Sequence, residues 1–293
     1  GRITPGDAGI WADKHIEPIA RINRFVKAHG AVPGIQLAHA GRKASAARPW
    51  EGGAHLADDA GGWPILGPSA LAFGAPLTKV PRAMTTADIA RVQAEFVAAA
   101  KRSLAAGCEW LELHGAHGYL GHQFLSPLSN RRTDAYGGSF DNRIRFLLEM
   151  ARAVRAVWPD RLPLTVRLSC TDWVEGGWDL DQSVELSRRL KTEGVDLVDC
   201  SSGGGVPSAK IPLGPGYQVP LAERIRREAG VATAAVGLIT DPKQADEIIR
   251  SGQADLVLLA REFLRDPNWP LRAARTLGVN PLPEPPVQYT RAW

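Results

Sequence analysis

The sequence predicts an α/β fold, a parallel (β/α)8 TIM barrel of which about six strand–helix units are present. Short β-branched or apolar runs alternate with longer helical stretches, which is typical of parallel strands joined by crossover helices. Gly194, Gly230 and Gly252 each stand just before such a run, where a helix has to end. The competing fold, a doubly wound sheet, requires a G-x-G-x-x-G turn after its first strand, and residues 38–43 are AHAGRK instead.

Each element follows from its local pattern. The predicted strands are residues 32–37, 110–113, 164–168, 195–199, 232–236 and 255–259. The predicted helices are residues 13–28, 86–106, 140–157, 181–192, 220–228 and 242–251. Thr86 to Asp88 supply N-cap chemistry at the start of the second helix, and Gly107 ends it.

We interpret residues 1–293 as a single domain, because no linker or low-complexity tract divides them. Two long irregular stretches, 42–84 and 118–138, follow the first and second predicted strands. In a β/α barrel that position is the catalytic face, and loops of this length are usually functional or mobile. The opening residues GRITPG have the composition of a loop, so the visible units predict a barrel that lacks its first two strands.

Composition excludes several classes of protein. The net charge of +4 comes from 35 basic and 31 acidic residues, and no basic block carries interleaved aromatics, so no nucleic-acid partner is expected. No apolar run is long enough to cross a bilayer and no secretory signal opens the chain, so no membrane association is expected. The cysteines are few and widely spaced, which is typical of free thiols in a reducing cytoplasm, where we expect the protein to reside.

Hydrogen-bond donors collect at the predicted strand ends, where β/α barrels carry their reactive groups. The residues at these ends are Gln36, His39, His114, His117, Arg167, Cys200, Ser201, Gly237, Ala260 and Arg261. The set contains no paired carboxylates for glycoside chemistry and no lysine for Schiff-base chemistry. Donors without bases suit the binding of an electron-rich cofactor and the polarisation of a carbonyl oxygen.

His114 and His117 follow the second strand with glycines beside them, a spacing that lets both N–H groups point at one oxygen. Two other interpretations are open: a zinc site completed by His122, or two hydrogen-bonded core histidines. No carboxylate is interleaved and no helix sets the spacing, so we expect no metal.

Arg167 ends an apolar strand, and a buried arginine needs a negative partner. A cofactor ring that gains charge on reduction would provide one, and an internal ion pair to Glu112 or Asp199 is the alternative. Gly237, Ala260 and Arg261 follow the last two visible strands. Barrels often bind phosphate there, and a short helix is expected to begin at Arg261.

Several motifs together resemble the Old Yellow Enzyme family, most closely its bacterial xenobiotic-reductase-like branch. The motifs are QLAHAGRK at 36–43, HGAHGY at 114–119, FLSP at 124–127, DAYGGS at 134–139, NR at 142–143, VRLS at 166–169, AREFL at 260–264 and DP at 266–267. The likeness spans nearly the whole chain, and the tyrosine–glycine–glycine stretch is its most specific part.

The resemblance implies an ene-reductase that depends on FMN and NADPH. NADPH would reduce FMN, and a hydride from flavin N5 would then reduce the C=C bond of an activated alkene, an α,β-unsaturated carbonyl or nitro compound. By the same resemblance, His114 and His117 would bind the substrate oxygen. Tyr119 would donate a proton to the α-carbon, with solvent as the alternative donor.

The resemblance also implies residues for the cofactor and for a partner subunit. Gln36 and Arg167 would contact the isoalloxazine ring, and the residues that would hold the ribityl phosphate are Gly237, Ala260 and Arg261. Arg291 matches an arginine that enters a neighbouring subunit's active site, so a homodimer or homotetramer is implied.

The family's first two strands, with their flavin contacts and a redox-tuning cysteine, have no counterpart in residues 1–293, and Cys108, Cys170 and Cys200 do not match that cysteine. The alternative function is therefore a truncated, flavin-poor barrel that acts as a non-catalytic binding module. The sequence leaves open the physiological alkene, the choice of NADPH or NADH, and the choice of dimer or tetramer.

Overall fold

Six parallel strands form one curled sheet in the computed structural model, which describes residues 1–292. The strands are β1 Gly34–Leu37, β4 Trp110–Gly115, β5 Leu164–Ser169, β6 Leu197–Ser201, β7 Ala232–Val236 and β8 Leu256–Leu258. Their order in the sheet is β1-β4-β5-β6-β7-β8, so each strand pairs with the next one along the chain. This order confirms the predicted parallel α/β arrangement and differs from a doubly wound sheet, in which the strand order reverses.

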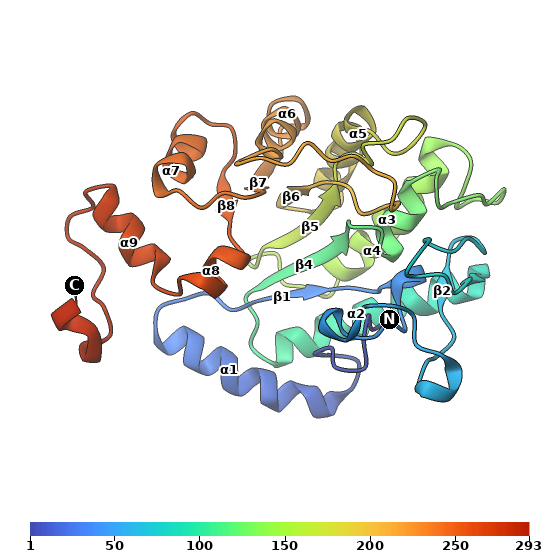
Figure 1. Ribbon diagram of the computed structural model, residues 1–293, viewed down its shortest axis with the longest axis horizontal. Helices are drawn as coiled ribbons and strands as arrows, with labels where there is room; N and C mark the ends of the chain where they lie inside the picture. The colour runs from blue at the N-terminus through green and yellow to red at the C-terminus, as the bar shows by residue number, and fades with distance from the viewer. Residues whose placement is uncertain (293) are drawn as a thin grey trace.

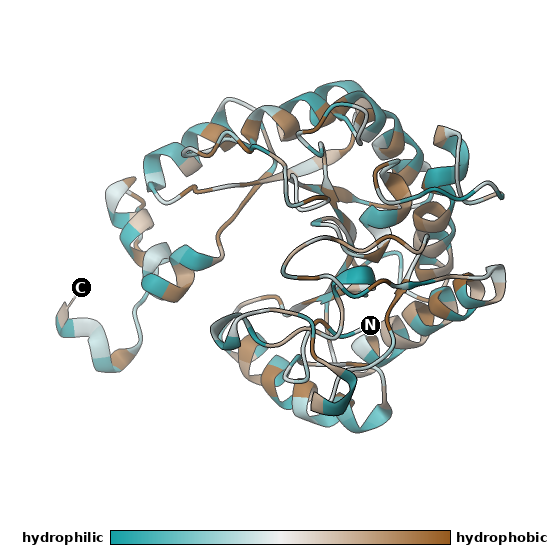
Figure 2. Ribbon diagram, turned by 45° about the vertical axis from the view of Figure 1, so that its right-hand side comes forward, coloured by the Kyte–Doolittle hydropathy of each residue, from teal (hydrophilic) through white to brown (hydrophobic). Residues whose placement is uncertain are grey.

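Helices connect the strands and cover the outer side of the sheet (Figure 1). They are α1 Ile16–Ala28, α2 Thr86–Ala105, α4 Phe140–Arg155, α5 Leu180–Thr192, α6 Val219–Ala229 and α7 Pro242–Arg250. Polar and apolar residues alternate along these helices (Figure 2), as expected for elements with one face on a core. All six were predicted. The first differs by three residues at its start, because its opening turn is a 3-10 helix, η1 Asp13–His15, and the others differ by no more than two residues at either end.

Strand side chains divide between the core and the inner side of the curl. On β4, Leu111 and Leu113 are fully buried in the core shared with the helices. The alternate residues Glu112 and His114 face the other side, since successive strand residues point in opposite directions. Polar groups are thereby carried to the inner side and to the carboxyl ends of the strands.

The second predicted helix begins at the predicted residue, Thr86, but its N-cap lies one residue earlier than the sequence pattern suggested. The N-cap of α2 is Thr85 rather than Thr86. Thr85 Oγ1 accepts a hydrogen bond of 3.1 Å from the Asp88 backbone N–H, and the Asp88 carboxylate accepts one of 2.9 Å from the Thr85 backbone N–H. Two adjacent threonines offer the same hydroxyl, and only the position three residues before Asp88 closes this reciprocal pair.

Short elements that were not predicted occupy the two stretches expected to be irregular and the segment near the C-terminal end. They are α3 Leu120–Leu125, α9 Trp269–Thr276, the two-residue strands β2 Leu66–Gly67 and β3 Arg82–Ala83, and the 3-10 helices η2 Gly41–Lys43, η3 Pro49–Glu51 and η4 Asp58–Ala60. The expected short helix after the last strand is α8 Arg261–Arg265. The chain then continues through α9 to the 3-10 helix η5 Val287–Ala292, which extends away from the sheet in both views (Figures 1 and 2).

Within residues 1–292, no helix combines the length and the apolar character that a bilayer span requires.

Candidate active site

The turn after β4 places the two histidines of the HGAHGY motif. His114 is the fifth residue of β4, and His117 follows in a left-handed backbone conformation with φ of 57°. A left-handed residue with a Cβ is strained by about 1–2 kcal/mol and needs support from its surroundings. That support comes from Ser169 Oγ, which accepts a 2.9 Å hydrogen bond from the His117 N–H, and from Lys43 Nζ, which donates one of 2.7 Å to the His117 carbonyl.

The two imidazole rings lie against each other at 83°, with their centroids 5.1 Å apart. His114 Nε2 is 3.3 Å from His117 Nδ1, and His117 Nε2 is 2.6 Å from Ser201 Oγ. The remaining nitrogen, His114 Nδ1, accepts a hydrogen bond of 3.1 Å from the Ala116 N–H. The structure therefore brings together the two histidines that were predicted to act as a pair, and one nitrogen of each ring lies next to one nitrogen of the other.

Both imidazoles are neutral near pH 7. Burial lowers the pKa of His114 to about 3, and the positive charge of Arg167 lowers it further. Burial lowers the pKa of His117 to about 2, with His114 and Arg167 acting in the same direction. A neutral imidazole carries one N–H and one bare nitrogen, so each ring can donate one hydrogen bond to a ligand oxygen.

Lys43 joins the loops that follow β4 and β6. Its ammonium donates hydrogen bonds of 2.7 Å to the carbonyls of His117 and Gly204 and lies 4.1 Å from the centre of the Phe73 ring. The two loops approach so closely that a Cβ on Gly118 would lie 2.0 Å from the Gly204 oxygen. Glycine is therefore required at position 118, and Lys43 holds the loop that carries His117.

Tyr119 packs edge-on against His114, with the ring centroids 5.0 Å apart. Burial raises the pKa of Tyr119 above its ordinary value, so its hydroxyl keeps its proton at neutral pH.

The third histidine of this region, His122, belongs to a separate buried network. Its Nδ1 accepts the Gly118 N–H at 2.8 Å, and its Nε2 lies 2.9 Å from Asp172.

Arg167 and Gln36 both meet carboxylates on the inner side of the sheet. Arg167 Nε lies 2.9 Å from Asp199 Oδ2, so the alternative partner weighed from the sequence is present. Gln36 Nε2 donates a 2.6 Å hydrogen bond to Glu112. Burial raises the pKa of Asp199, Glu112 raises it further, and Arg167 opposes the shift.

These inner polar groups fit a flavin. Within residues 1–292, Arg167 Nε and both Asp199 oxygens are buried without a hydrogen bond, although Arg167 Nε and Asp199 Oδ2 form an ion pair. Buried polar atoms normally find partners, and the carbonyl-rich edge of an isoalloxazine ring accepts from guanidinium and amide donors. Arg167 and Gln36 supply those donors.

The predicted phosphate residues lie at the ends of β7 and β8. Gly237 has φ of 129°, and a Cβ there would lie 2.9 Å from the Tyr217 ring. Ala260 is the N-cap of α8. Arg261 is exposed and, among the described residues, has no ion-pair partner, so its charge is available to an anion.

Arg291 lies in η5, on the extended C-terminal segment (Figure 1), and its side chain is exposed. The structure does not bring it to the histidine pair of its own chain.

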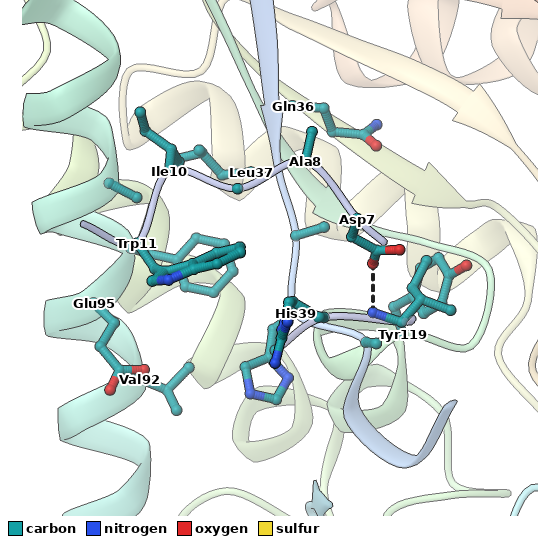
Figure 3. A pocket seen from close by; sticks show the side chains of 18 of the residues that line it. Asp7, Ala8, Ile10, Trp11, Gln36, Leu37, His39, Val92, Glu95 and Tyr119 are labelled. Carbon is teal, nitrogen blue, oxygen red and sulfur yellow. Dashed lines mark hydrogen bonds between the residues drawn. The ribbon is translucent and has the colours of Figure 1, made fainter. Parts of the chain in front are cut away.

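A pocket of about 780 Å³ lies between β1, α2 and the first eleven residues. Figure 3 shows Gln36, His39 and Tyr119 around it, whereas neither His114, His117 nor Arg167 lines it.

Comparison with known proteins places this chain in a family. The sequence profile of the NADH:flavin oxidoreductase / NADH oxidase family matches residues 1–280. The chain belongs to this family. The match confirms the predicted resemblance to the Old Yellow Enzyme family, the predicted class of flavin oxidoreductase and FMN as the cofactor.

Individual members of the family agree with this assignment. The NADPH dehydrogenase of Geobacillus sp. (strain WCH70) is 50% identical over 293 residues, which are 100% of this chain and 80% of that protein. The NADPH dehydrogenase of Bacillus subtilis (strain 168) is 47% identical with the same coverage. Both names agree with the prediction of NADPH as the reductant.

Two solved structures share the fold. Morphinone reductase in complex with tetrahydroNAD has a TM-score of 0.72 and 27% identity, with 96% of this chain and 75% of that chain covered. A 2-naphthoyl-CoA reductase has a TM-score of 0.84 and 25% identity, with 95% of this chain covered. This chain spans 43% of the length of that second protein.

Three residues that support the histidine pair had no assigned role from the sequence. Ser169 is the last residue of β5, and the predicted strand ended one residue before it. Lys43 was noted only as part of a motif. Ser201 was noted only as one of several residues at strand ends. Extension of the predicted strand by one residue would have placed Ser169 at its end. The contact of Lys43 joins segments more than a hundred residues apart and leaves no local signal.

Proposed function

We propose that the chain is an ene-reductase, which reduces the C=C bond of α,β-unsaturated carbonyl or nitro compounds with NADPH as the electron source. The observation that carries the proposal is the distance of 3.3 Å between His114 Nε2 and His117 Nδ1. Two buried, neutral N–H groups at that separation can both donate to one oxygen placed about 2.9 Å from each. Withdrawal of electron density through that oxygen makes the β-carbon of a conjugated alkene electrophilic.

The remaining site residues are assigned to the cofactor and to proton transfer. Bound FMN supplies the hydride chemistry. Gln36 and Arg167 are proposed to hold its ring, and the residues proposed to hold its phosphate are Gly237, Ala260 and Arg261. Tyr119 is the proposed proton donor to the α-carbon, because its protonated hydroxyl belongs to a ring that packs on His114.

The fold and assembly proposals follow from the same family. The six-stranded sheet is proposed to represent six units of a (β/α)8 barrel, with residues 1–293 in a single domain. Arg291 is proposed to enter the site of a second copy in a homodimer or homotetramer. Exposed apolar side chains on the same C-terminal region, Leu264 at 84% and Val287 at 83%, support a protein partner there. We propose a cytoplasmic location, which suits an enzyme that draws on NADPH.

The test is spectroscopic and kinetic. The purified chain, loaded with FMN and kept anaerobic, is expected to lose its flavin absorbance on addition of NADPH and to regain it with 2-cyclohexen-1-one, with cyclohexanone as the product. H114A and H117A are expected to lower kcat/KM by about 10²–10³, the usual effect of losing one oxyanion donor. H29A, which changes an exposed histidine at the end of α1, is the matched control.

Two results would contradict the proposal. If both histidine variants kept wild-type kinetics, the substrate would be bound elsewhere. If the chain stayed colourless after titration with FMN, the non-catalytic binding module would be the better description.

A further inference from the structure

The hydrogen bonds around the imidazole pair fix one ring and leave the other free to change. His114 Nδ1 accepts the Ala116 N–H at 3.1 Å, and a backbone N–H can only donate. His114 therefore carries its proton on Nε2 in every state of the pair. This Nε2–H points at His117 Nδ1, 3.3 Å away.

Without a ligand, the pair satisfies itself. Because His114 donates, His117 Nδ1 accepts, and the His117 proton lies on Nε2 and is donated to Ser201 Oγ at 2.6 Å. In this arrangement neither ring offers a free N–H to a substrate. A ligand oxygen that accepts from both rings requires His117 to carry its proton on Nδ1 instead.

Ser201 is the partner that allows this change. When the proton of His117 lies on Nδ1, its bare Nε2 faces Ser201 Oγ, which must then donate rather than accept. A hydroxyl can do both by rotating, whereas a backbone N–H or carbonyl would lock one tautomer. The other acceptor near the Ser201 hydroxyl is Gln218 Oε1, at a long 3.4 Å, and Ser202 Oγ already donates to that oxygen at 2.6 Å.

We propose that Ser201 is a positioning residue that selects the tautomer of His117, and so switches the imidazole pair between a self-bonded state and a state with two converging donors. The inference deepens the proposed function, on which it rests. During the switch His117 loses one proton from Nε2 and gains one at Nδ1 through exchange with water, so its charge does not change. Ser201 keeps its own proton and only reverses the direction of its hydrogen bond.

The burial of the site makes the switch matter. Ser201 is 4% exposed, so its hydroxyl is held in place beside Nε2, whereas the His117 ring is partly buried and can exchange its protons with water. Removal of the hydroxyl would take the partner of His117 Nε2 away in both states, and the ring would no longer be held in the orientation that lets its Nδ1–H converge with the His114 Nε2–H on a ligand oxygen. The expected result is weaker binding of the substrate oxygen without a matching loss of flavin.

The experiment compares S201A, S201T and the wild type, all loaded with oxidised FMN and without NADPH. The dissociation constant of 2-cyclohexen-1-one is measured from the perturbation of the flavin spectrum. S201A is expected to bind about tenfold more weakly, and S201T, which keeps the hydroxyl, to bind within about threefold of the wild type. S187A removes an equally buried hydroxyl on α5 and controls for folding.

Nitrogen NMR of histidine-labelled protein reads the tautomer directly. In the wild type, the His117 proton is expected on Nε2 without ligand and on Nδ1 with it, and S201A is expected to lose this change. Equal affinity of S201A and the wild type, or an unchanged tautomer in the wild type, would overturn the role of Ser201 alone. No binding of the enone by the wild type would overturn the proposed function as well.

Discussion

The histidine pair depends on side chains from three segments that are distant from it in sequence. Lys43 holds the carbonyl of His117, Ser169 holds its N–H, and Ser201 contacts its ring. Sequence reasoning found the pair because strand-end glycines and paired imidazoles are local features. It did not predict that Lys43, Ser169 and Ser201 support the pair, because a hydroxyl or an ammonium forms a particular hydrogen bond only when the fold brings it within about 3 Å of its partner.

The pair also predicts how stability depends on pH. Unfolded histidines titrate near pH 6.5, whereas burial lowers the pKa of His114 to about 3 and that of His117 to about 2. Between these values the unfolded state binds more protons, so the free energy of unfolding falls as the pH drops below 6.5. The slope is expected to be at most about 1.4 kcal/mol per pH unit for each histidine.

Urea unfolding at pH 4.5 and pH 7 measures this slope. H114N/H117N is expected to lose less stability than the wild type between the two pH values, and His39, whose pKa burial also lowers to about 3, retains part of the dependence in both proteins. H29N is the exposed control. A double variant with the same slope as the wild type would show that these imidazoles are protonated without cost in the native state.

At the scale of elements, the sequence predicted every long helix and every strand of the main sheet, because each has a strong hydrophobic period. Several short elements were not predicted. α3 is buried on all sides and so has no polar face to create a period, and β2 and β3 have two residues each. β1 begins at Gly34 rather than at residue 32, because Val32 is exposed and Pro33 has no N–H to donate to a sheet.

The start of α2 offers a test at this scale. T85A is expected to lower the free energy of unfolding by about 1 kcal/mol, because it removes the hydroxyl that accepts the Asp88 N–H. T86A, which changes the first helical residue beside it, is expected to have a smaller effect or to stabilise, since alanine has the higher helix propensity. Chemical denaturation of the two variants compares them, and the reverse order would place the N-cap at Thr86.

At the scale of the whole molecule, the core of sheet and helices encloses all three cysteines. Cys108 is 2% exposed, and Cys170 and Cys200 are fully buried. Burial raises the pKa of the Cys108 and Cys200 thiols, so little thiolate forms at neutral pH. The rate at which these thiols react with a reagent therefore measures how often the core opens as a unit.

A thiol reagent such as Ellman's reagent checks this expectation. The native protein is expected to react slowly, at the rate at which its core opens, and the denatured protein to show three reactive thiols at once. S251C adds a thiol at an exposed position after α7 and should react immediately, which controls for reagent access. Rapid labelling of a native cysteine would indicate a core that opens locally.

The strand order β1-β4-β5-β6-β7-β8 affects how the sheet can fold while the chain is being synthesised. Each pairing joins successive strands of this sheet, so no pairing spans the whole chain, and the entropy cost of loop closure rises only slowly with the length of each connection. During synthesis every strand after β1 leaves the ribosome when its partner already exists, and it need not wait for a distant segment. The sheet can therefore grow one unit at a time, and a nascent chain stalled after α4 or any later connecting helix already has a paired edge ready for the next strand.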